Sequence, residues 1–279
     1  NEEWISDKTR QHVDGLKLQR LDRPYLRENG RLRPATWPEA FAAIAAKLKG
    51  VDAKRVGAIA GDLAGVEEMW ALKTLMASLG SPNLDCRQDG SALSPANGRA
   101  SYLFNPTIAG IEDADAILIV GANPRREAAI VNARLRKRWR MGPLPIGVVG
   151  ENVDLTYPYS YLGAGPESLS QLAAGGEFLD ALKAAKRPLV IVGAGVAARA
   201  DGAALLAAVA KLAQGIGAVA EGWNGLAVLH NAAARVGGLD IGFVPGEGGL
   251  AALDMVKAGA VDVLFNLGAD EIEIEDGAF

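Results

Sequence analysis

Short apolar runs that end close to a glycine recur along the chain and predict strands of parallel sheets. Ala116–Val120 is wholly apolar, follows acidic residues and precedes Gly121, which is typical of a strand buried on both faces. The same pattern recurs in Val56–Ala60, Leu144–Gly150, Leu189–Val192 and Val263–Leu267. We expect the runs at residues 117–120 and 263–267 to be inner strands, because both are apolar at nearly every position.

Helical signals alternate with these runs. Thr36 and Glu39 form a capping-box pattern, and Phe41, Ile44 and Leu48 then supply the apolar face of a helix. Further helices are expected at Val66–Leu79, Ala128–Arg138, Ser168–Leu172, Phe178–Ala185, Ala203–Ile216 and Ala227–Val236. Alternating strands and helices predict an α/β fold with two doubly wound, mainly parallel sheets.

The length of 279 residues suggests two domains after a short N-terminal arm. Residues 1–34 are polar and rich in arginine, and we interpret them as an arm that ends a preceding domain. The first α/β domain is expected over residues 35–160 and a second, truncated one over residues 161–279, with a tyrosine-rich link between them. Because the chain starts at Asn1 without a methionine, we expect it to be a fragment.

Composition narrows the class of protein. The net charge of −4 and the 22% of charged residues favour neither disorder nor nucleic-acid binding. No apolar run reaches the roughly 18 residues of a membrane helix, so no membrane insertion is expected. Cys86 is the single cysteine, which excludes internal disulfides and any cysteine-built cluster within these residues and suggests a reducing compartment.

The loop after residues 116–120 is the first candidate site. Ligands of open parallel sheets bind at the carboxyl ends of the strands, where Gly121–Pro124 turns the chain. Pro124 suits the first turn of a helix, because its missing N–H is not needed there. Gly121, Asn123 and Pro124 are therefore the candidate cofactor-binding residues.

A second glycine turn, Gly193–Ala198, matches the pattern G-x-G-x-x-A, and Glu221 could be a ribose-binding acid. A dinucleotide site needs a helix that begins at the glycines, so that its N-terminus meets the pyrophosphate. Here Arg199 and Asp201 intervene, and Asp201 resembles a delayed N-cap. Two interpretations remain, a nicotinamide or flavin site and a turn that permits close packing; the spacing favours the second.

The remaining candidates for chemistry are few. Arg87 could lower the thiol pKa of Cys86, although the cysteine is equally explained as a small residue at a strand end. His12 and His230 lie far apart in the chain and have no cysteine or second histidine nearby, so no histidine-built metal site is expected. Arg134–Arg140 is basic, as a solvated helix end or a partner-binding surface would be. We identify no catalytic residue.

Residue chemistry thus leaves three classes open: an enzyme with a large cofactor, a nucleotide-binding module and a structural subunit. Several segments resemble the large iron–sulfur (G-type) subunit of respiratory complex I, the NADH:quinone oxidoreductase. These segments are Asn1–Arg10, Asp14–Leu16, Gln19–Leu21, Asn105–Ile111, Val120–Arg125, Asn132–Arg134, Val153–Tyr157, Leu239–Gly242 and Leu267–Asp270.

This resemblance implies a role in respiratory electron transfer from NADH to quinone, with iron–sulfur clusters in a missing upstream part and none in this chain. It also implies a molybdopterin oxidoreductase-like fold. In the molybdenum enzymes, a loop like Gly121–Pro124 lies against a pterin–guanine dinucleotide, and a residue near Cys86 ligates the metal. The residues around Cys86 depart from the usual ligand segment.

We therefore expect a structural region with a vestigial cofactor cleft, inactive by itself. The alternative is an oxidoreductase module with a live molybdopterin–guanine dinucleotide. The implied partners are the other peripheral-arm subunits of complex I. The implied location is peripheral, on the cytoplasmic face of the bacterial inner membrane or on the mitochondrial matrix side.

Overall fold

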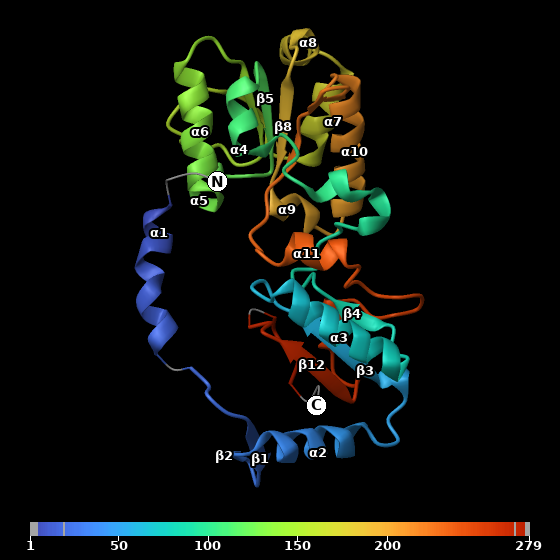
Figure 1. Cartoon of the computed structure of the whole chain (residues 1–279). Coiled ribbons are helices and arrows are strands. Elements are labelled where there is room, and N and C mark those ends of the chain that lie inside the picture. Colours follow the sequence, from blue (N-terminus) through green and yellow to red (C-terminus); the bar gives the residue numbers. More distant parts are fainter. Residues whose placement is uncertain (1–4, 19, 271, 277–279) are drawn as a thin grey trace.

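The computed structural model describes residues 5–18, 20–270 and 272–276 and contains two parallel sheets (Figure 1). The larger sheet has five strands in the order β11-β8-β5-β6-β7, and all four of its pairings are parallel. Its strands are β5 (Ala116–Val120), β6 (Ile146–Val149), β7 (Ser160–Gly163), β8 (Pro188–Val192) and β11 (Leu226–Val228). The observed α/β fold with parallel sheets agrees with the sequence-based expectation.

Helices cover both faces of the larger sheet. Ile117 and Ile119 of β5 point into a core with α6, whereas Leu118 and Val120 point into the core that holds α7, α8 and α10. Figure 1 shows α4 and α6 on one side of β5 and β8, with α7 and α10 on the other. The helices of this unit are α4 (Thr107–Gly110), α5 (Pro124–Glu127), α6 (Ala129–Arg140), α7 (Pro166–Ala174), α8 (Glu177–Ala184), α9 (Ala194–Ala197) and α10 (Gly202–Gly215).

The smaller sheet has the order β12-β3-β4 and is also parallel. Alternate residues of β3 face two cores: Ala58 lies with Met69 of α3, and Ile59 lies with Met255 of α12. Its elements are β3 (Val56–Ala60), β4 (Asn83–Asp85), β12 (Val263–Leu267), α3 (Val66–Leu79), α11 (Arg235–Asp240) and α12 (Ala252–Met255).

The sheets do not divide the chain at residues 160 and 161, where sequence patterns place a domain boundary. The tyrosine-rich stretch leads into β7, inside the larger sheet, and β12 returns to pair with β3. The larger unit is therefore inserted between β4 and β12. An apolar run predicts that a strand is buried, but it does not predict which strand pairs with it. The order of the strands along the chain therefore gave the wrong domain boundary.

Two element predictions were wrong. Residues 263–267 form β12 as expected, but β12 is an edge strand of the described sheet and only half-buried. Residues 227–236 are not one helix: β11 ends at Val228, and α11 begins at Arg235. The prediction that residues 117–120 form an inner strand is confirmed, because β5 is central in its sheet.

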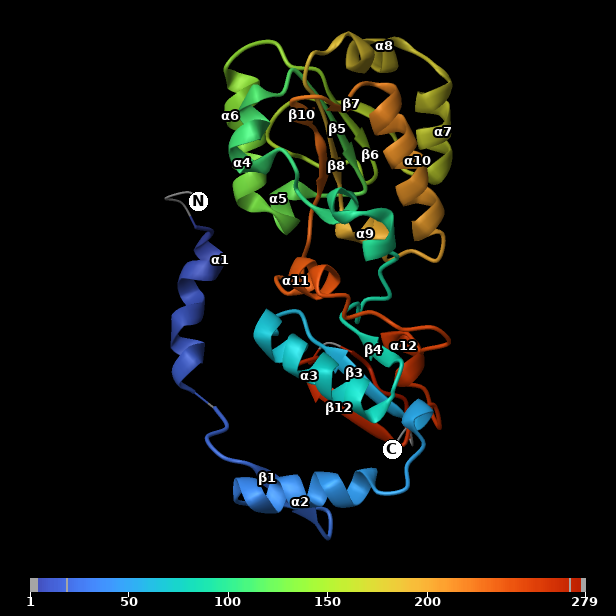
Figure 2. The same cartoon turned by 45° about the vertical axis from the view of Figure 1, so that its right-hand side comes forward.

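The N-terminal arm and α2 run along the outside of the smaller unit (Figures 1 and 2). The arm contains α1 (Asp7–Arg10), a 3-10 helix (Gln11–Lys17) and the hairpin of β1 (Tyr25–Glu28) and β2 (Arg31–Pro34). Thr36 and Glu39 form the predicted capping box of α2 (Trp37–Leu48). The expected apolar face of α2 is covered only at Leu48, which packs against the core, whereas Phe41 is 60% and Ile44 is 42% exposed.

Short 3-10 helices and a small hairpin complete the fold. The hairpin pairs β9 (Val219–Ala220) with β10 (Trp223–Asn224), and the 3-10 helices are Ala53–Arg55, Pro95–Asn97, Arg99–Tyr102 and Ile111–Asp113. Among the described residues, no helix is both long and apolar enough to cross a membrane.

Candidate cofactor cleft

The loops after β5 and β8 lie side by side at the carboxyl end of the larger sheet. From β5 the chain continues to β6 and β7 on one side of the sheet, and later to β8 and β11 on the other. The strand order therefore reverses between β5 and β8, which is where doubly wound sheets bind their ligands. Gly121 follows β5 and Gly193 follows β8, so the structure brings the two glycine turns together.

These two turns pack directly against each other. A Cβ atom on Gly193 would overlap the carbonyl oxygen of Gly121, and one on Gly121 would overlap the side chain of Val196. Gly121 also has a φ of +58°, a conformation that favours glycine. Both glycines are therefore required by contacts within the chain. These contacts fix the two turns against each other at this point.

Asn123 and Pro124 lie in the same loop but do not form an open polar site. The amide of Asn123 donates to Glu127 Oε1 at 2.6 Å, so the acid already occupies the start of α5. Pro124 is buried and opens α5, as its sequence position predicts. Asn123 Oδ1 is buried and accepts no hydrogen bond from any of the described residues.

A small pocket lies on the β6 side of Gly121, with a volume of about 250 Å³. Its lining includes Gly150, Gly165 and Val196, with Arg199 as its one charged residue. Arg199 Nε lies 2.6 Å from Asp201 Oδ1, so this cation is already paired. The volume is below the ~300–1,000 Å³ of typical small-molecule sites.

The second motif, Gly193–Ala198, lacks the geometry of a dinucleotide cradle. The helix that directly follows Gly193, α9, has only four residues. The long helix α10 begins later, at Gly202. Asp201 stands just before α10 as expected, but its carboxylate accepts from Arg199 and does not cap the helix. Glu221 lies in the β9–β10 turn, outside the parallel sheet. These observations favour the packing interpretation of the motif.

Cys86 is buried beneath α11. It is 2% exposed, its amide donates to the carbonyl of Phe243, and a Cβ on Gly238 would stand 2.7 Å from its Sγ. Burial and the nearby Asp85 raise the pKa of this thiol to about 12. The thiol is therefore neutral at physiological pH, and Arg87 pairs with Asp85 instead of activating it.

The two histidines are not brought to one site. His12 is exposed in the arm. His230 Nε2 lies 2.6 Å from the carbonyl oxygen of Tyr102, and burial lowers the pKa of its ring. In the described part of the chain, no group of three or more His, Cys, Asp or Glu side chains is placed to hold a metal ion. The basic helix α6 is partly paired, since Arg134 and Lys137 both contact Glu112.

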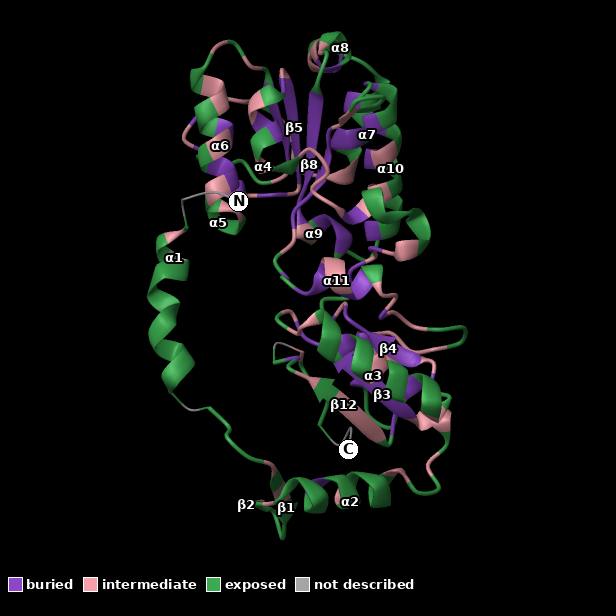
Figure 3. Ribbon diagram, viewed as in Figure 1, coloured by how far each residue is buried: buried purple, intermediate pink, exposed green. Residues whose placement is uncertain are grey.

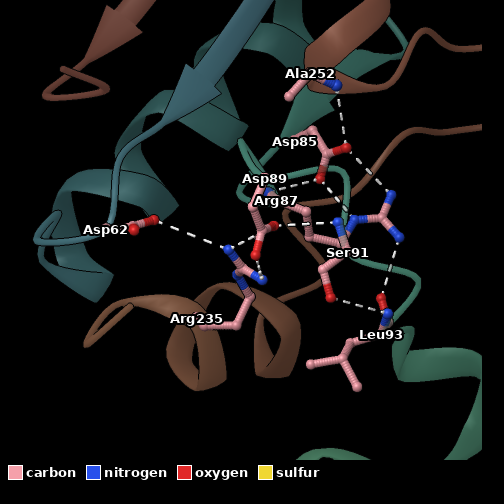
Figure 4. A network of polar contacts seen from close by, with 8 residues as sticks. All are labelled: Asp62, Asp85, Arg87, Asp89, Ser91, Leu93, Arg235 and Ala252. Atoms are coloured by element: carbon pink, nitrogen blue, oxygen red, sulfur yellow. Dashed lines mark hydrogen bonds and ion pairs between the residues drawn. The ribbon is translucent and has the colours of Figure 1, made fainter. Parts of the chain in front are cut away.

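A buried ion network lies at the carboxyl end of the smaller sheet, where sequence patterns predict no site (Figure 4). Arg235 of α11 is 3% exposed, and its Nη2 lies 3.0 Å from Asp89 Oδ1 and 3.9 Å from Asp62 Oδ1. Beside it, Asp85 accepts from Arg87 and from the amide of Ala252. A lone arginine within an apolar stretch was the only sequence signal for this network.

The network fixes α11 between the two units. Figures 1 and 2 both show α9 and α11 between the larger and the smaller sheet. Arg235 ties α11 to the loops after β3 and β4, and the amide of Ala234 donates to the carbonyl of Asp62. The chain's own helices α9 and α11 therefore lie between the two sheets.

Comparisons with known proteins identify this class of fold. A family model described as molybdopterin oxidoreductase matches residues 20–278, so the chain belongs to that family. A solved formyltransferase/hydrolase complex (FhcABCD) from Methylorubrum extorquens, in complex with methylofuran, contains a chain of similar fold. Its TM-score is 0.51 at 19% identity, over 80% of this chain and 66% of that one.

The chain is also homologous to the G-type subunit of NADH-quinone oxidoreductase. It is 43% identical to the protein from Rickettsia bellii over 276 residues and 44% identical to that from Rickettsia felis over 277 residues. Each match covers 99% of this chain but only 39% and 40% of the relatives. The chain therefore spans about two fifths of the length of these relatives.

The family name implies a pterin cofactor, but the residues present do not fit one. Beside Gly121 the pocket has a volume of only about 250 Å³, and the Cβ directions of Gly121 and Gly193 are filled by Val196 and by backbone. At Cys86, the expected metal ligand is a buried thiol covered by Gly238. Among the described residues, the cations beside the two places, Arg199 and Arg87, are already paired with aspartates.

Proposed function

We propose that this chain is a structural region of the G-type subunit in a proton-pumping NADH:quinone oxidoreductase, with a vestigial cofactor cleft. The observation that carries this proposal is the pocket beside Gly121, which has a volume of only about 250 Å³ and whose one charged residue, Arg199, is already paired with Asp201. A ligand site there would need exposed N–H groups with room in front of them. The burial of Cys86 beneath α11 supports the same conclusion.

In this proposal, electrons pass through iron–sulfur clusters in polypeptide upstream of these residues. A cluster needs several thiolates at once, and this chain contributes only Cys86. The chain would instead fix the position of the cluster-bearing part and of neighbouring peripheral-arm subunits. This peripheral part of the complex would lie on the cytoplasmic face of the bacterial inner membrane or on the mitochondrial matrix side.

The N-terminal arm is the proposed bridge to the upstream part. Leu16, Leu21 and Leu32 are large hydrophobic residues that lie exposed along it. An isolated two-stranded hairpin such as β1–β2 is at best marginally stable in water. An arm of this composition therefore gains stability when another surface covers it, and residues 1–34 would end an iron–sulfur domain that provides such a surface.

Metal and nucleotide content of the intact complex tests the proposal. The complex that contains the full-length subunit is purified anaerobically, and its iron, molybdenum and released guanine nucleotide are measured together. We expect iron in the amount its clusters require, with molybdenum and guanine nucleotide far below one per complex. Iron serves as the internal control for cofactor loss during purification.

Stoichiometric molybdenum or guanine nucleotide would favour the alternative, a live molybdopterin module. A matched variant then assigns the site: Val196→Ala enlarges the space beside Gly121, whereas Val219→Ala changes an exposed valine of β9. Cofactor content that responds to the first variant but not to the second would place the group in this cleft and contradict our proposal. Failure of the full-length chain to co-purify with the other subunits would contradict its assignment to the complex.

A further inference from the structure

Strand β12 has apolar side chains on both faces. Val263 and Phe265 lie on the face shared with α3, and Leu264 lies on the face shared with α12. A parallel strand of this kind normally has neighbouring strands on both sides and helices above and below it. In the described residues, however, β12 pairs with β3 alone.

The apolar residues of β12 are correspondingly only half-buried. All five residues of β3 are buried, whereas Val263, Leu264, Phe265 and Leu267 are intermediate and Asn266 is exposed. Figure 3 shows this change across the sheet, from buried β3 to the partly exposed ribbon of β12. The sheet therefore loses its cover at β12.

The other edges of the two sheets are protected. Residues 243–250 hydrogen-bond beside β4, through the amides of Cys86 and Gly246 among others. Residues 103–105 do the same beside β11. Strand β7 carries exposed Ser160 and Tyr161 instead of a wholly apolar sequence. Natural sheets protect their edges by such covering or by polar residues, and over the described residues β12 has one exposed polar residue, Asn266, and no segment hydrogen-bonded along its free edge.

The free edge of β12 also presents backbone groups. The carbonyl of Leu267 accepts from the amide of Gly61 at 2.9 Å, so it points toward β3. Successive residues of a strand direct their backbone groups to opposite sides, so those of Leu264 and Asn266 point away from β3. Within the described ranges, no backbone hydrogen bond outside the β3 ladder involves these two residues.

We propose that a further strand pairs with this edge of β12 and that polypeptide of the same subunit, outside residues 1–279, supplies it. The chain spans only about two fifths of its relatives, so most of a subunit of that length lies outside it. A parallel strand would extend the order β12-β3-β4 and bury both faces of β12. A second copy related by a two-fold axis would pair antiparallel and break this pattern.

Hydrogen exchange of the full-length subunit tests the inference. We expect the amides of Leu264 and Asn266 to exchange at least ~100-fold more slowly than unstructured peptide, as hydrogen-bonded strand amides do. The amide of Gly61 is the slow reference in the same sheet, and that of Leu63, whose side chain is 85% exposed, is the fast one. Fast exchange at Leu264 and Asn266 in the folded subunit would overturn the proposal.

Dilution and assembly distinguish the possible partners. Slow exchange that is lost on dilution would assign the strand to a second copy, and slow exchange found only in the assembled complex would assign it to another subunit. Either result overturns the proposal. Hydroxyl-radical labelling of Phe265, with the 44%-exposed Tyr161 as the labelled control, adds a second measurement. A covering helix would protect Phe265 but leave the two amides fast, which also contradicts a strand.

Discussion

Gly193 lies so close to Gly121 that a side chain on Gly193 would overlap the carbonyl oxygen of Gly121. The amide of Gly193 meanwhile donates to the carbonyl of Val120 at 2.9 Å, which fixes the loop against β5. Within the same motif, a Cβ on Gly195 would meet no atom within 4 Å from the other described residues, apart from its chain neighbours and its own helix. Two glycines of one sequence pattern thus have different roles.

Gly193→Ala should destabilise the protein by more than ~2 kcal/mol, because the new methyl group meets backbone that cannot move away. The matched variant Gly195→Ala should be neutral or stabilising, since alanine is the better helix former by ~1 kcal/mol. Urea unfolding of both variants measures the difference. Equal stabilities would contradict the close contact between the loops.

The buried ion network predicts a second large effect. Arg235→Met removes a buried cation and leaves the partly exposed Asp89 and Asp62 without it, which should cost ~1–3 kcal/mol, as does the loss of other charged hydrogen-bond partners. Arg199→Met removes a half-exposed partner of Asp201 and should cost no more than ~1 kcal/mol. Thermal or urea unfolding compares the two. A small loss at Arg235 would show that α11 is held by other contacts.

The central strand predicts a third effect. Ile119→Asp places a carboxylate in the fully buried core between β5 and α6 and should cost several kcal/mol or prevent folding. Tyr161→Asp, on the exposed edge strand β7, should change the free energy of unfolding by ~0.5 kcal/mol or less. Soluble yield and urea unfolding measure the effect of each of the two variants. A stable Ile119→Asp protein would contradict the inner position of β5.

The sequence predicted the position of an element closely where a single local pattern defines that element. The apolar runs located β3, β5 and β8 to within one residue, and Thr36 with Glu39 located the start of α2. Long-range pairing was not predictable, because β12 joins β3 across an inserted unit of the chain. The helix expected at residues 227–236 failed because pairing of β11 with β8 overrides the helical preference of its alanines.

The candidate site was predictable only in part. The positions of Gly121 and Gly193 at strand ends followed from pattern, but their mutual contact depends on the pairing of β5 with β8. Arg235 and Asp89 are 146 positions apart in the chain, so no local pattern connects them. The cover that α11 gives to Cys86 likewise arises from a segment far away in sequence.

Cys86 offers a test of burial through its reactivity. At pH 8 the native thiol should react with iodoacetamide at least ~100-fold more slowly than an unfolded one, because its pKa is raised to about 12. Leu63→Cys in a Cys86→Ala background supplies an exposed control thiol. Rapid labelling of native Cys86 would contradict its cover by α11.

The same shift makes stability depend on pH. The folded-state pKa of Cys86 lies above the ordinary value of 9.0. The contribution of this thiol to the free energy of unfolding is therefore fully present below pH 9. It should decline as pH rises from 9 toward 12, because the unfolded chain then releases the proton first. Cys86→Ala should flatten this decline in unfolding experiments at constant ionic strength. An unchanged slope would assign the decline to other groups.

Electron transfer from NADH depends on a site that binds the nucleotide, and the glycine motif is the one place where the sequence suggests such a site. The four-residue α9 cannot present the N-terminus of a long helix, and Gly193 is already in contact with Gly121. We therefore expect the isolated chain to show no saturable change in NADH fluorescence up to millimolar concentration. It should also neither oxidise NADH nor reduce quinone analogues. Saturable binding that Gly195→Val abolishes, while folding is retained, would refute this prediction and restore a nucleotide-binding role for Gly193–Ala198.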